Sequence, residues 1–405
     1  MRKGNRELIK EINRNLVLNL IKDQGPISRT DLARLSGLSP ASVSGITAAL
    51  MAINMVQETG EGESRGGRRP VLLRLNEKAG YVVGLKLMEN AISIALTDLD
   101  ARVVKHSVFH GDEAGDEQPL SVETILSRII DAVERTIRES DVEREQVLGI
   151  GIGMAGSIDG ESGTCRYSPY FKWRNVQIAQ PIAEHFALPV YVENDVNTLT
   201  IAEQWFGFGQ DVEHFVVVTV GRGIGAGITT NGQFYRGAVG SAGEFGHIPL
   251  SNEGQLVTLE NLASDPAVLL QVQKLIDQGE ATVLTEADPL TMEAVIAAAD
   301  DGDPLARLVL ADSGRWLGIG LATLVNILSP QLIIVGGEGV QAGEWRFEPM
   351  REALKAYAFD GLADQLDIVI EPSGDETWAR GAATLVLGDI FKSPVHKKES
   401  EKVFV

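Results

Sequence analysis

Apolar residues in the first 76 positions recur first at helical spacing and then at alternating spacing. Residues 8–21 carry them every three or four positions, which predicts a helix that ends near Gly25. Ser28 and Ser39 stand where N-terminal caps belong, so two shorter helices should follow them, separated by a sharp turn at Gly37. Two further stretches alternate like strands, at 56–60 and 71–75. This order of elements is typical of a winged helix-turn-helix.

The third predicted helix and the loop between the two strands carry the candidate DNA contacts. Val43, Ile46 and Leu50 should bury one face of this helix. The small polar residues expected outside it, able to approach a major groove, are Ser39, Ser42, Ser44 and Thr47. The loop is rich in glycine, and its arginines would suit phosphates or a minor groove: Arg65, Arg68 and Arg69. The alternative is a small helical domain that binds protein; the agreement of caps, turn and basic loop favours DNA.

Residues 81–391 repeat one pattern of strands and helices. The first round predicts strands that start at 81, 91 and 102, a helix at 122–139, and then strand, helix and strand at 147–153, 176–186 and 189–193. The second round predicts strands at 214–221, 223–230 and 232–236, several helices, strands at 331–337 and 366–370 and a closing helix at 376–391. Each round opens with a three-stranded meander, so an α/β protein is expected, with the two-lobed outline of an actin-like ATPase (ribonuclease H-like) fold.

The domain boundaries follow from these patterns. We expect a winged helix-turn-helix at 1–76, a first lobe at 77–200, a second lobe at 201–391 and a polar tail at 392–405. The closing helix is able to pack back on the first lobe. The linker at 76–80 is short and polar, which predicts a direct connection between module and body.

Composition and charge restrict the function. The chain has 405 residues and a formal net charge of −20, but residues 1–76 hold 12 basic and 7 acidic groups, whereas the remainder holds 24 and 49. A basic module on an acidic body is therefore indicated. Neither a signal peptide nor a long apolar run is visible, which favours the cytoplasm and no membrane association. The single cysteine, Cys165, excludes an internal disulfide and a cysteine-rich metal site.

Residues 241–260 hold the most concentrated candidate chemistry of the body. Glu244, His247 and Glu260 stand among small residues that let a ligand or another stretch of backbone come close. Two carboxylates and an imidazole can make several hydrogen bonds to the vicinal hydroxyls of a sugar. The alternative is an exposed glycine-rich turn whose charges face water.

An ordered set of motifs resembles the ROK family of sugar kinases and sugar-responsive repressors over nearly the whole chain. The set comprises the basic wing, 192–197, 221–228, 243–247 and 333–337. The resemblance implies a sugar pocket in the cleft between the lobes, lined by Gly156, Asn194, Asp195, Glu244, His247 and Glu260. In kinases of that family the acid at the position of Asp195 takes the proton from the attacking hydroxyl. The residue would also suit the start of a helix.

Two departures from the family pattern matter. Its kinases carry an acid and a Gly-Gly-Thr turn at the first strand, where this chain has Lys86 and then Met88, Glu89 and Asn90, so ATP binding is not expected. Many members also hold zinc through the histidine and three cysteines, but the stretch 251–259 has no cysteine. We therefore expect no structural zinc and no cofactor.

These observations favour a regulator over an enzyme. The preferred interpretation is a cytoplasmic, sugar-responsive, DNA-binding repressor of carbohydrate-utilisation genes, which binds operator DNA as a homodimer or a dimer of dimers and is released by a sugar. No catalytic residue is expected in a regulator. The alternatives are an ATP-dependent sugar kinase, with Asp195 as its base, and a sugar-binding scaffold whose module binds protein.

Overall fold

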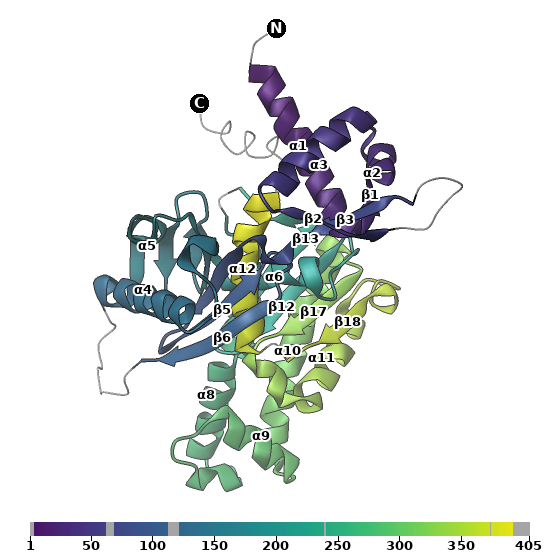
Figure 1. Ribbon diagram of the computed structural model, residues 1–405. Coiled ribbons are helices and arrows are strands. Elements are labelled where there is room, and N and C mark those ends of the chain that lie inside the picture. The colour runs from purple at the N-terminus through teal and green to yellow at the C-terminus, as the bar shows by residue number, and fades with distance from the viewer. Residues whose placement is uncertain (1–3, 62–68, 112–120, 239, 373, 392–405) are drawn as a thin grey trace.

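The computed structural model describes residues 4–61, 69–111, 121–238, 240–372 and 374–391. Figure 1 shows three parts: a small N-terminal module at the top, and below it two lobes, each built around a sheet. The fold class predicted from the sequence is confirmed.

The module has the predicted helix order. Its helices are α1 (Gly4–Gln24), α2 (Arg29–Ser36) and α3 (Pro40–Ala52), and its three-stranded sheet is ordered β1-β3-β2, with β1 at Ile27–Ser28, β2 at Val56–Glu61 and β3 at Val71–Leu75. Ser28 Oγ accepts from Asp31 N at 3.1 Å and Ser39 Oγ from Ser42 N at 3.1 Å, so both expected caps are present. Gly37 turns the chain with φ 69°, and α2 meets α3 at 116°, as in a helix-turn-helix. The two-residue strand β1 was not predicted.

The prediction that Thr47 faces outward is wrong. Its side chain is fully buried, and Oγ1 donates to Ser44 O at 3.2 Å and accepts from Arg29 Nε at 3.3 Å. The residues of α3 that are exposed in its place include Ala48 and Ala49. Apolar residues occupy most sides of α3, so its sequence alone does not define the buried face.

The first lobe is built on a five-stranded sheet ordered β11-β7-β4-β5-β6. The strands are β4 (Tyr81–Leu87), β5 (Ala91–Asp98), β6 (Val103–His110), β7 (Val147–Met154) and β11 (Val190–Asn194), and the helices are α4 (Val122–Arg138), α5 (Ala179–Phe186) and α6 (Asp195–Phe206). A second, antiparallel sheet was not predicted: β8 (Ser157–Asp159), β9 (Thr164–Ser168) and β10 (Trp173–Gln177). Because β10 occupies 173–177, the helix predicted from 176 begins only at Ala179.

The second lobe repeats this topology. Its sheet is ordered β14-β13-β12-β17-β18, so the first three strands form a meander and the fourth and fifth are added beside the first, as in the first lobe. The strands are β12 (Phe215–Val220), β13 (Ile224–Thr230), β14 (Gln233–Tyr235), β17 (Leu332–Gly336) and β18 (Asp367–Ile370). The helices are α7 (Glu260–Ala263), α8 (Asp265–Asp277), α9 (Met292–Asp300), α10 (Pro304–Leu328) and α11 (Glu344–Tyr357).

The closing helix α12 (Asp375–Phe391) crosses the sheet of the first lobe and extends to the module (Figure 1). A Cβ on Gly84 of β4 would lie 2.1 Å from Ala379 O, and one on Gly151 of β7 would lie 1.9 Å from Ala382 O. Only glycine therefore permits this close contact between helix and sheet. At its C-terminal end α12 shares a hydrophobic core with α1, in which Val17, Ile21 and Leu387 are buried.

One described helix, α10, is long and apolar enough to span a bilayer by length and composition alone. More than half of its apolar window, 56%, is buried inside the protein. Its residues Leu317, Leu321 and Val325 belong to the core of the second lobe, which accounts for the apolar character of the helix.

Candidate functional site

A cleft between the two lobes encloses about 820 Å³. The six residues predicted for the pocket all line it: Gly156, Asn194, Asp195, Glu244, His247 and Glu260. A volume in this range is typical of pockets for small molecules. The structure thus brings together residues up to 104 positions apart, from Gly156 to Glu260; their role as sugar contacts stays a prediction.

The wall contributed by the first lobe lies where β11 ends and α6 begins. Asn194 caps α6: its side-chain oxygen accepts from Asn197 N at 3.2 Å, and its Nδ2 donates to Gly156 O at 3.1 Å. Gly156 has φ 130°, and a Cβ on it would lie 2.4 Å from Tyr167 O, which explains why glycine stands there. Asn194, rather than Asp195, is therefore the capping residue, and Asp195 is the first residue of the helix.

One part of the wall contributed by the second lobe is a 3-10 turn, Phe245–His247, preceded by Glu244. Phe245 is buried and anchors the turn, whereas Glu244 and His247 are exposed, with Glu244 Oε2 and His247 Nε2 3.9 Å apart. Gly243 has φ 91°, and a Cβ on it would lie 1.8 Å from Ala226 O. The turn therefore packs closely against β13. In this position it presents the side chains of Glu244 and His247 to the cleft.

Glu260 has a structural partner inside the cleft. Its Oε2 accepts from Ile224 N at 2.9 Å, which ties the start of α7 to the glycine-rich turn between β12 and β13. Gly221, Gly223 and Gly225 belong to this tight hairpin, where Gly221 N donates to Gly223 O at 3.1 Å. Glu260 therefore shapes the cleft in addition to lining it.

Tyr170 is a cleft residue that the sequence analysis missed. It lies between β9 and β10, and burial, followed by the negative charges of Glu260 and Asp195, raises the pKa of its phenol to about 12. The hydroxyl is therefore a neutral hydrogen-bond donor near two carboxylates, next to an aromatic face. No motif marks this residue, because it lies in the turn between two short strands that the sequence analysis did not predict.

Asp195 has an unusual setting for a carboxyl group. Burial raises its pKa, and this effect is opposed first by the positive charge of Lys86 and then by the hydrogen bond that Val196 N donates to Oδ1 at 3.0 Å. Lys86 Nζ lies 3.5 Å from the ring centroid of Trp378 in α12, a cation–π contact. Lys86, which the sequence analysis expected in place of an acid, thus lies near enough to Asp195 to favour its charged form.

An ion pair joins the two lobes across the cleft. Arg222 Nη1 in the β12–β13 turn lies 2.6 Å from Glu89 Oε2 in the turn after β4. Arg222 N also donates to Glu338 Oε1 at 2.9 Å. Glu89 therefore places a carboxylate against the one arginine of the glycine-rich turn, where it would repel a nucleotide phosphate.

The stretch that could have held a zinc loop is a β-hairpin. Strands β15 (Pro249–Asn252) and β16 (Gln255–Thr258) pair antiparallel, and Leu259 N donates to Ile248 O at 3.1 Å. Among the described residues there is no group of three or more His, Cys, Asp or Glu side chains able to hold a metal ion. Cys165 is buried in β9, where burial raises the pKa of its thiol to about 11.

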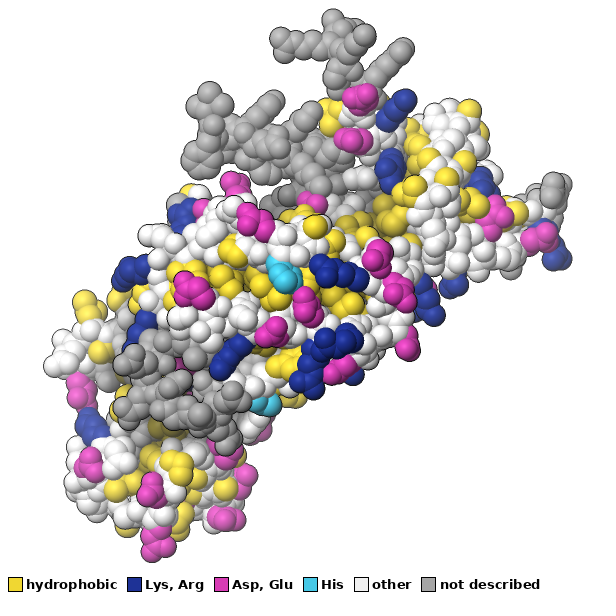
Figure 2. Space-filling model, turned by 60° about the vertical axis from the view of Figure 1, so that its left-hand side comes forward, with side chains coloured by type: hydrophobic (Ala, Val, Ile, Leu, Met, Phe, Trp, Pro, Cys, Tyr) yellow, Lys and Arg dark blue, Asp and Glu magenta, His cyan; other side chains and the backbone are white. Residues whose placement is uncertain are grey.

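The predicted DNA contacts differ in their placement. Ser39, the cap that precedes α3, is exposed, as are Ser42 and Ser44 on the N-terminal half of α3 and Arg69 at the end of the wing. Arg65 and Arg68 lie outside the described residues. Figure 2 shows the module at the upper right with a largely uncharged surface that carries a few basic and a few acidic side chains, while both kinds are interspersed over the body.

A two-lobed actin-like body that carries a winged helix-turn-helix and an interlobe cleft defines a class of protein, the ligand-responsive transcriptional regulators. The chain belongs to the ROK family, whose model matches residues 82–389. It is 34% identical over 400 residues to the xylose repressor of Caldicellulosiruptor bescii, covering 96% of this chain and 99% of that protein. It also matches the crystal structure of a ROK family transcriptional regulator, a homolog of the Escherichia coli MLC protein, with a TM-score of 0.83, 30% identity and coverage of 97% and 99%.

A kinase of the family matches less of the chain. The ROK family glucokinase from Streptomyces griseus, solved with glucose and AMPPNP, has a TM-score of 0.64 and 28% identity, and covers 76% of this chain but 99% of its own. The kinase thus corresponds to the two lobes alone, whereas the regulators extend over the module as well. This difference and the repressor relatives identify the chain as a regulator and not an enzyme.

Proposed function

We propose that a sugar bound in the cleft between the lobes controls how the N-terminal module binds operator DNA. The observation that carries this proposal is the convergence of six polar or small residues from both lobes on one cleft, in a chain that also holds a helix-turn-helix. A pentose or hexose offers hydroxyls to Glu244, His247 and Asn194, and an apolar face to Tyr170. Because the named relative is a xylose repressor, D-xylose is the first candidate.

Two helices connect the cleft directly to the module. α6 begins at the Asn194 cap and, at about 1.5 Å per residue, extends about 18 Å to Phe206. α12 begins beside the cleft at Asp375 and ends at Phe391, about 25 Å away. The helices are packed together, since a Cβ on Gly381 would lie 2.8 Å from Thr198 O.

Both helices end on α1 of the module. Lys22 Nζ lies 4.3 Å from the ring centroid of Trp205 in α6 and 5.5 Å from that of Phe391 in α12. Asn19 Nδ2 donates to Phe391 O at 2.9 Å. A change in lobe orientation at the cleft would therefore move the surface on which α1 rests.

The sugar acts only through its different affinities for the two lobe arrangements. A hundredfold change in DNA affinity requires about 2.7 kcal/mol of coupling. A few hydrogen bonds made in one arrangement and lost in the other are enough for this difference. We infer that the sugar releases the repressor, that the protein acts in the cytoplasm, and that a homodimer or a dimer of dimers places two modules on a pseudopalindromic operator.

The test is fluorescence anisotropy with labelled DNA from upstream of the protein's own operon, with D-xylose or D-glucose added in turn. We expect the wild type to bind and one sugar to release it. Ser44→Glu should abolish DNA binding by placing a negative charge on the exposed face of α3, while Ser162→Glu, an equivalent change on the first lobe, should not. Equal DNA binding by the two variants would contradict the assignment of α3 to the DNA interface.

The second arm of the experiment addresses the cleft. In thermal unfolding, the sugar that releases the DNA should stabilise the wild type but not Glu244→Ala, because a ligand stabilises only a protein that binds it. A shift of equal size in both proteins would place the sugar elsewhere.

A further inference from the structure

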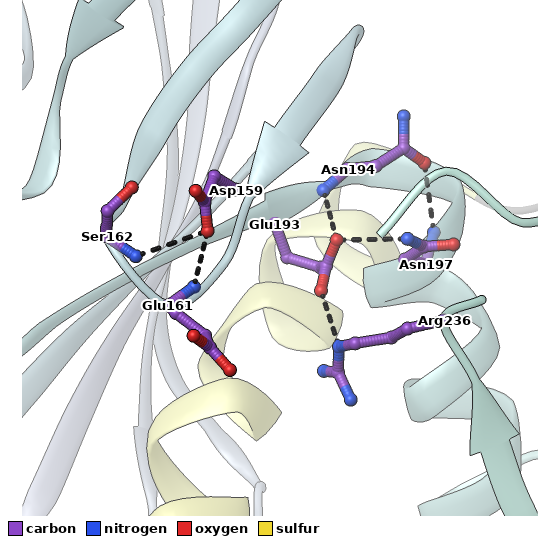
Figure 3. Close-up of polar contacts among 7 residues, drawn as sticks. All are labelled: Asp159, Glu161, Ser162, Glu193, Asn194, Asn197 and Arg236. Carbon is purple, nitrogen blue, oxygen red and sulfur yellow. Dashed lines mark hydrogen bonds and ion pairs between the residues drawn. The ribbon is translucent and has the colours of Figure 1, made fainter. Parts of the chain in front are cut away.

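The carboxylate of Glu193 is buried at the boundary between the two lobes. Its side chain is only 4% exposed, at the end of β11, and it accepts three hydrogen bonds (Figure 3). Oε1 accepts from Asn194 N at 2.9 Å and from Asn197 Nδ2 at 2.9 Å. Oε2 accepts from Arg236 Nε at 3.1 Å. A buried charge needs such donors, and here they come from both lobes.

The partners on the first lobe belong to one wall of the cleft. Asn194 contributes its own backbone N–H to Glu193, and its side chain contacts Gly156 O and Asn197 N. Asn197, one turn along α6, is held by the same carboxylate oxygen. Glu193 therefore sets the position of the helix start on which Asn194 and Asp195 lie.

The partner on the second lobe leads to the opposite wall. Arg236 follows β14, and its carbonyl accepts from Ala242 N at 3.1 Å, which closes the loop that ends at Gly243 and Glu244. The same loop contacts the first lobe again, where Ser241 Oγ and Ser157 Oγ are 3.0 Å apart. The guanidinium of Arg236 also lies 5.0 Å from the ring centroid of Phe234.

We propose that Glu193 and Arg236 form a clasp that holds the two walls of the cleft in register, and that it thereby sets the affinity for the sugar and its effect on DNA binding. Both are positioning residues, because neither lines the cleft itself. The inference rests on the proposed function, namely that a sugar binds between these walls. The fixed charge of arginine and the single hydrogen bond from its Nε make this contact directional, which a lysine reproduces only in part.

The chain offers a matched control for this clasp. Arg166 Nη2 lies 3.0 Å from Asp159 Oδ2, and its side chain is 48% exposed, against 51% for Arg236. This pair joins β8 and β9 within the first lobe and does not cross to the second. Asp159 is drawn beside the clasp in Figure 3.

The experiment measures the dissociation constant of the active sugar, D-xylose in the first instance, by isothermal titration with the full-length protein. Arg236→Ala should weaken binding by about tenfold, equivalent to about 1.4 kcal/mol, and Arg236→Lys should recover part of the loss. Arg166→Ala should change the constant by less than about twofold. In anisotropy, Arg236→Ala should still bind operator DNA without sugar, but need a correspondingly higher sugar concentration for release.

Three results would overturn the clasp: wild-type sugar affinity in Arg236→Ala, equal losses in Arg236→Ala and Arg166→Ala, or no recovery by lysine. Glu193→Gln, if it folds, supplies a second measurement. If the two residues act as one pair, the double variant should lose no more sugar affinity than Arg236→Ala alone. If the wild type binds no sugar, the proposed function itself is overturned. If the wild type and Arg236→Ala bind sugar equally, only the clasp is overturned.

Discussion

Replacing Glu203 by glutamine should stabilise the protein at neutral and alkaline pH. Glu203 is buried in α6, and burial, then the nearby Glu371, raises the pKa of its carboxyl group from 4.5 to about 7. Phe208 N, which donates to Oε2 at 3.0 Å, and the positive charge of Arg380 oppose this rise without cancelling it. Among the described residues no group supplies a proton to the buried Oε2 of Glu371, so a protonated Glu203 is its natural donor.

The magnitude follows from the pKa. A carboxyl group that titrates near 4.5 when unfolded and near 7 when folded costs about 3 kcal/mol of stability once the pH exceeds the folded value. The cost is small below pH 4.5, where both states are protonated, and it grows as the pH rises toward 7, because the unfolded state then releases its proton more readily. Glutamine can accept from Phe208 N and donate to Glu371 at every pH, so the variant avoids this cost.

Thermal unfolding of wild type and Glu203→Gln in matched buffers from pH 5 to pH 8 tests this reasoning. For a chain of this length that unfolds in one transition, about 3 kcal/mol corresponds to about 3 to 4 °C. The variant should match the wild type within about 1 °C at pH 5 and exceed it by most of that amount at pH 8. Glu280→Gln, an exposed change, is the control and should show no pH-dependent difference. A variant less stable than the wild type at pH 8 would refute the argument, because it would mean that folded Glu203 is ionised and favourably paired.

Four further predictions test the module, its connection to the cleft and the absence of kinase activity. Lys22→Ala should leave sugar binding and sugar-free DNA binding within about twofold of the wild type but weaken release by sugar, measured by anisotropy, because it removes the cation–π contact with α6. Arg69→Ala should weaken DNA binding and reduce the salt slope of log K by about 1. Gly84→Ala should destabilise the protein in urea unfolding by about 2 kcal/mol or more, since its Cβ would meet Ala379 O at 2.1 Å. A coupled assay of ADP release should detect no turnover with any sugar, and Asp195→Asn should leave that baseline unchanged.

The sequence predicted those helices, turns and strands that are marked by caps, glycine turns or hydrophobic periodicity. Ser28, Ser39 and Gly37 marked the helix boundaries of the module because caps and left-handed turns depend on neighbouring residues only. The two rounds of strands predicted the repeated lobe for the same reason, since alternation and helical periodicity are local properties. The ordered motifs indicated the family, and through that resemblance they predicted the six residues that line the cleft.

Tertiary structure decided what depends on residues far apart in the chain. Thr47 is buried on the side of α3 that faces Arg29 of α2, which the sequence of an apolar helix does not reveal by itself. Glu193 stands beside Asn194 in a sequence motif, but its burial and its contact with Arg236 exist only once two lobes meet. The sequence by itself determined the parts and their order. Only the folded chain could place the ends of α6 and α12 against Lys22, because contacts between residues more than 180 positions apart follow from packing and not from local preference.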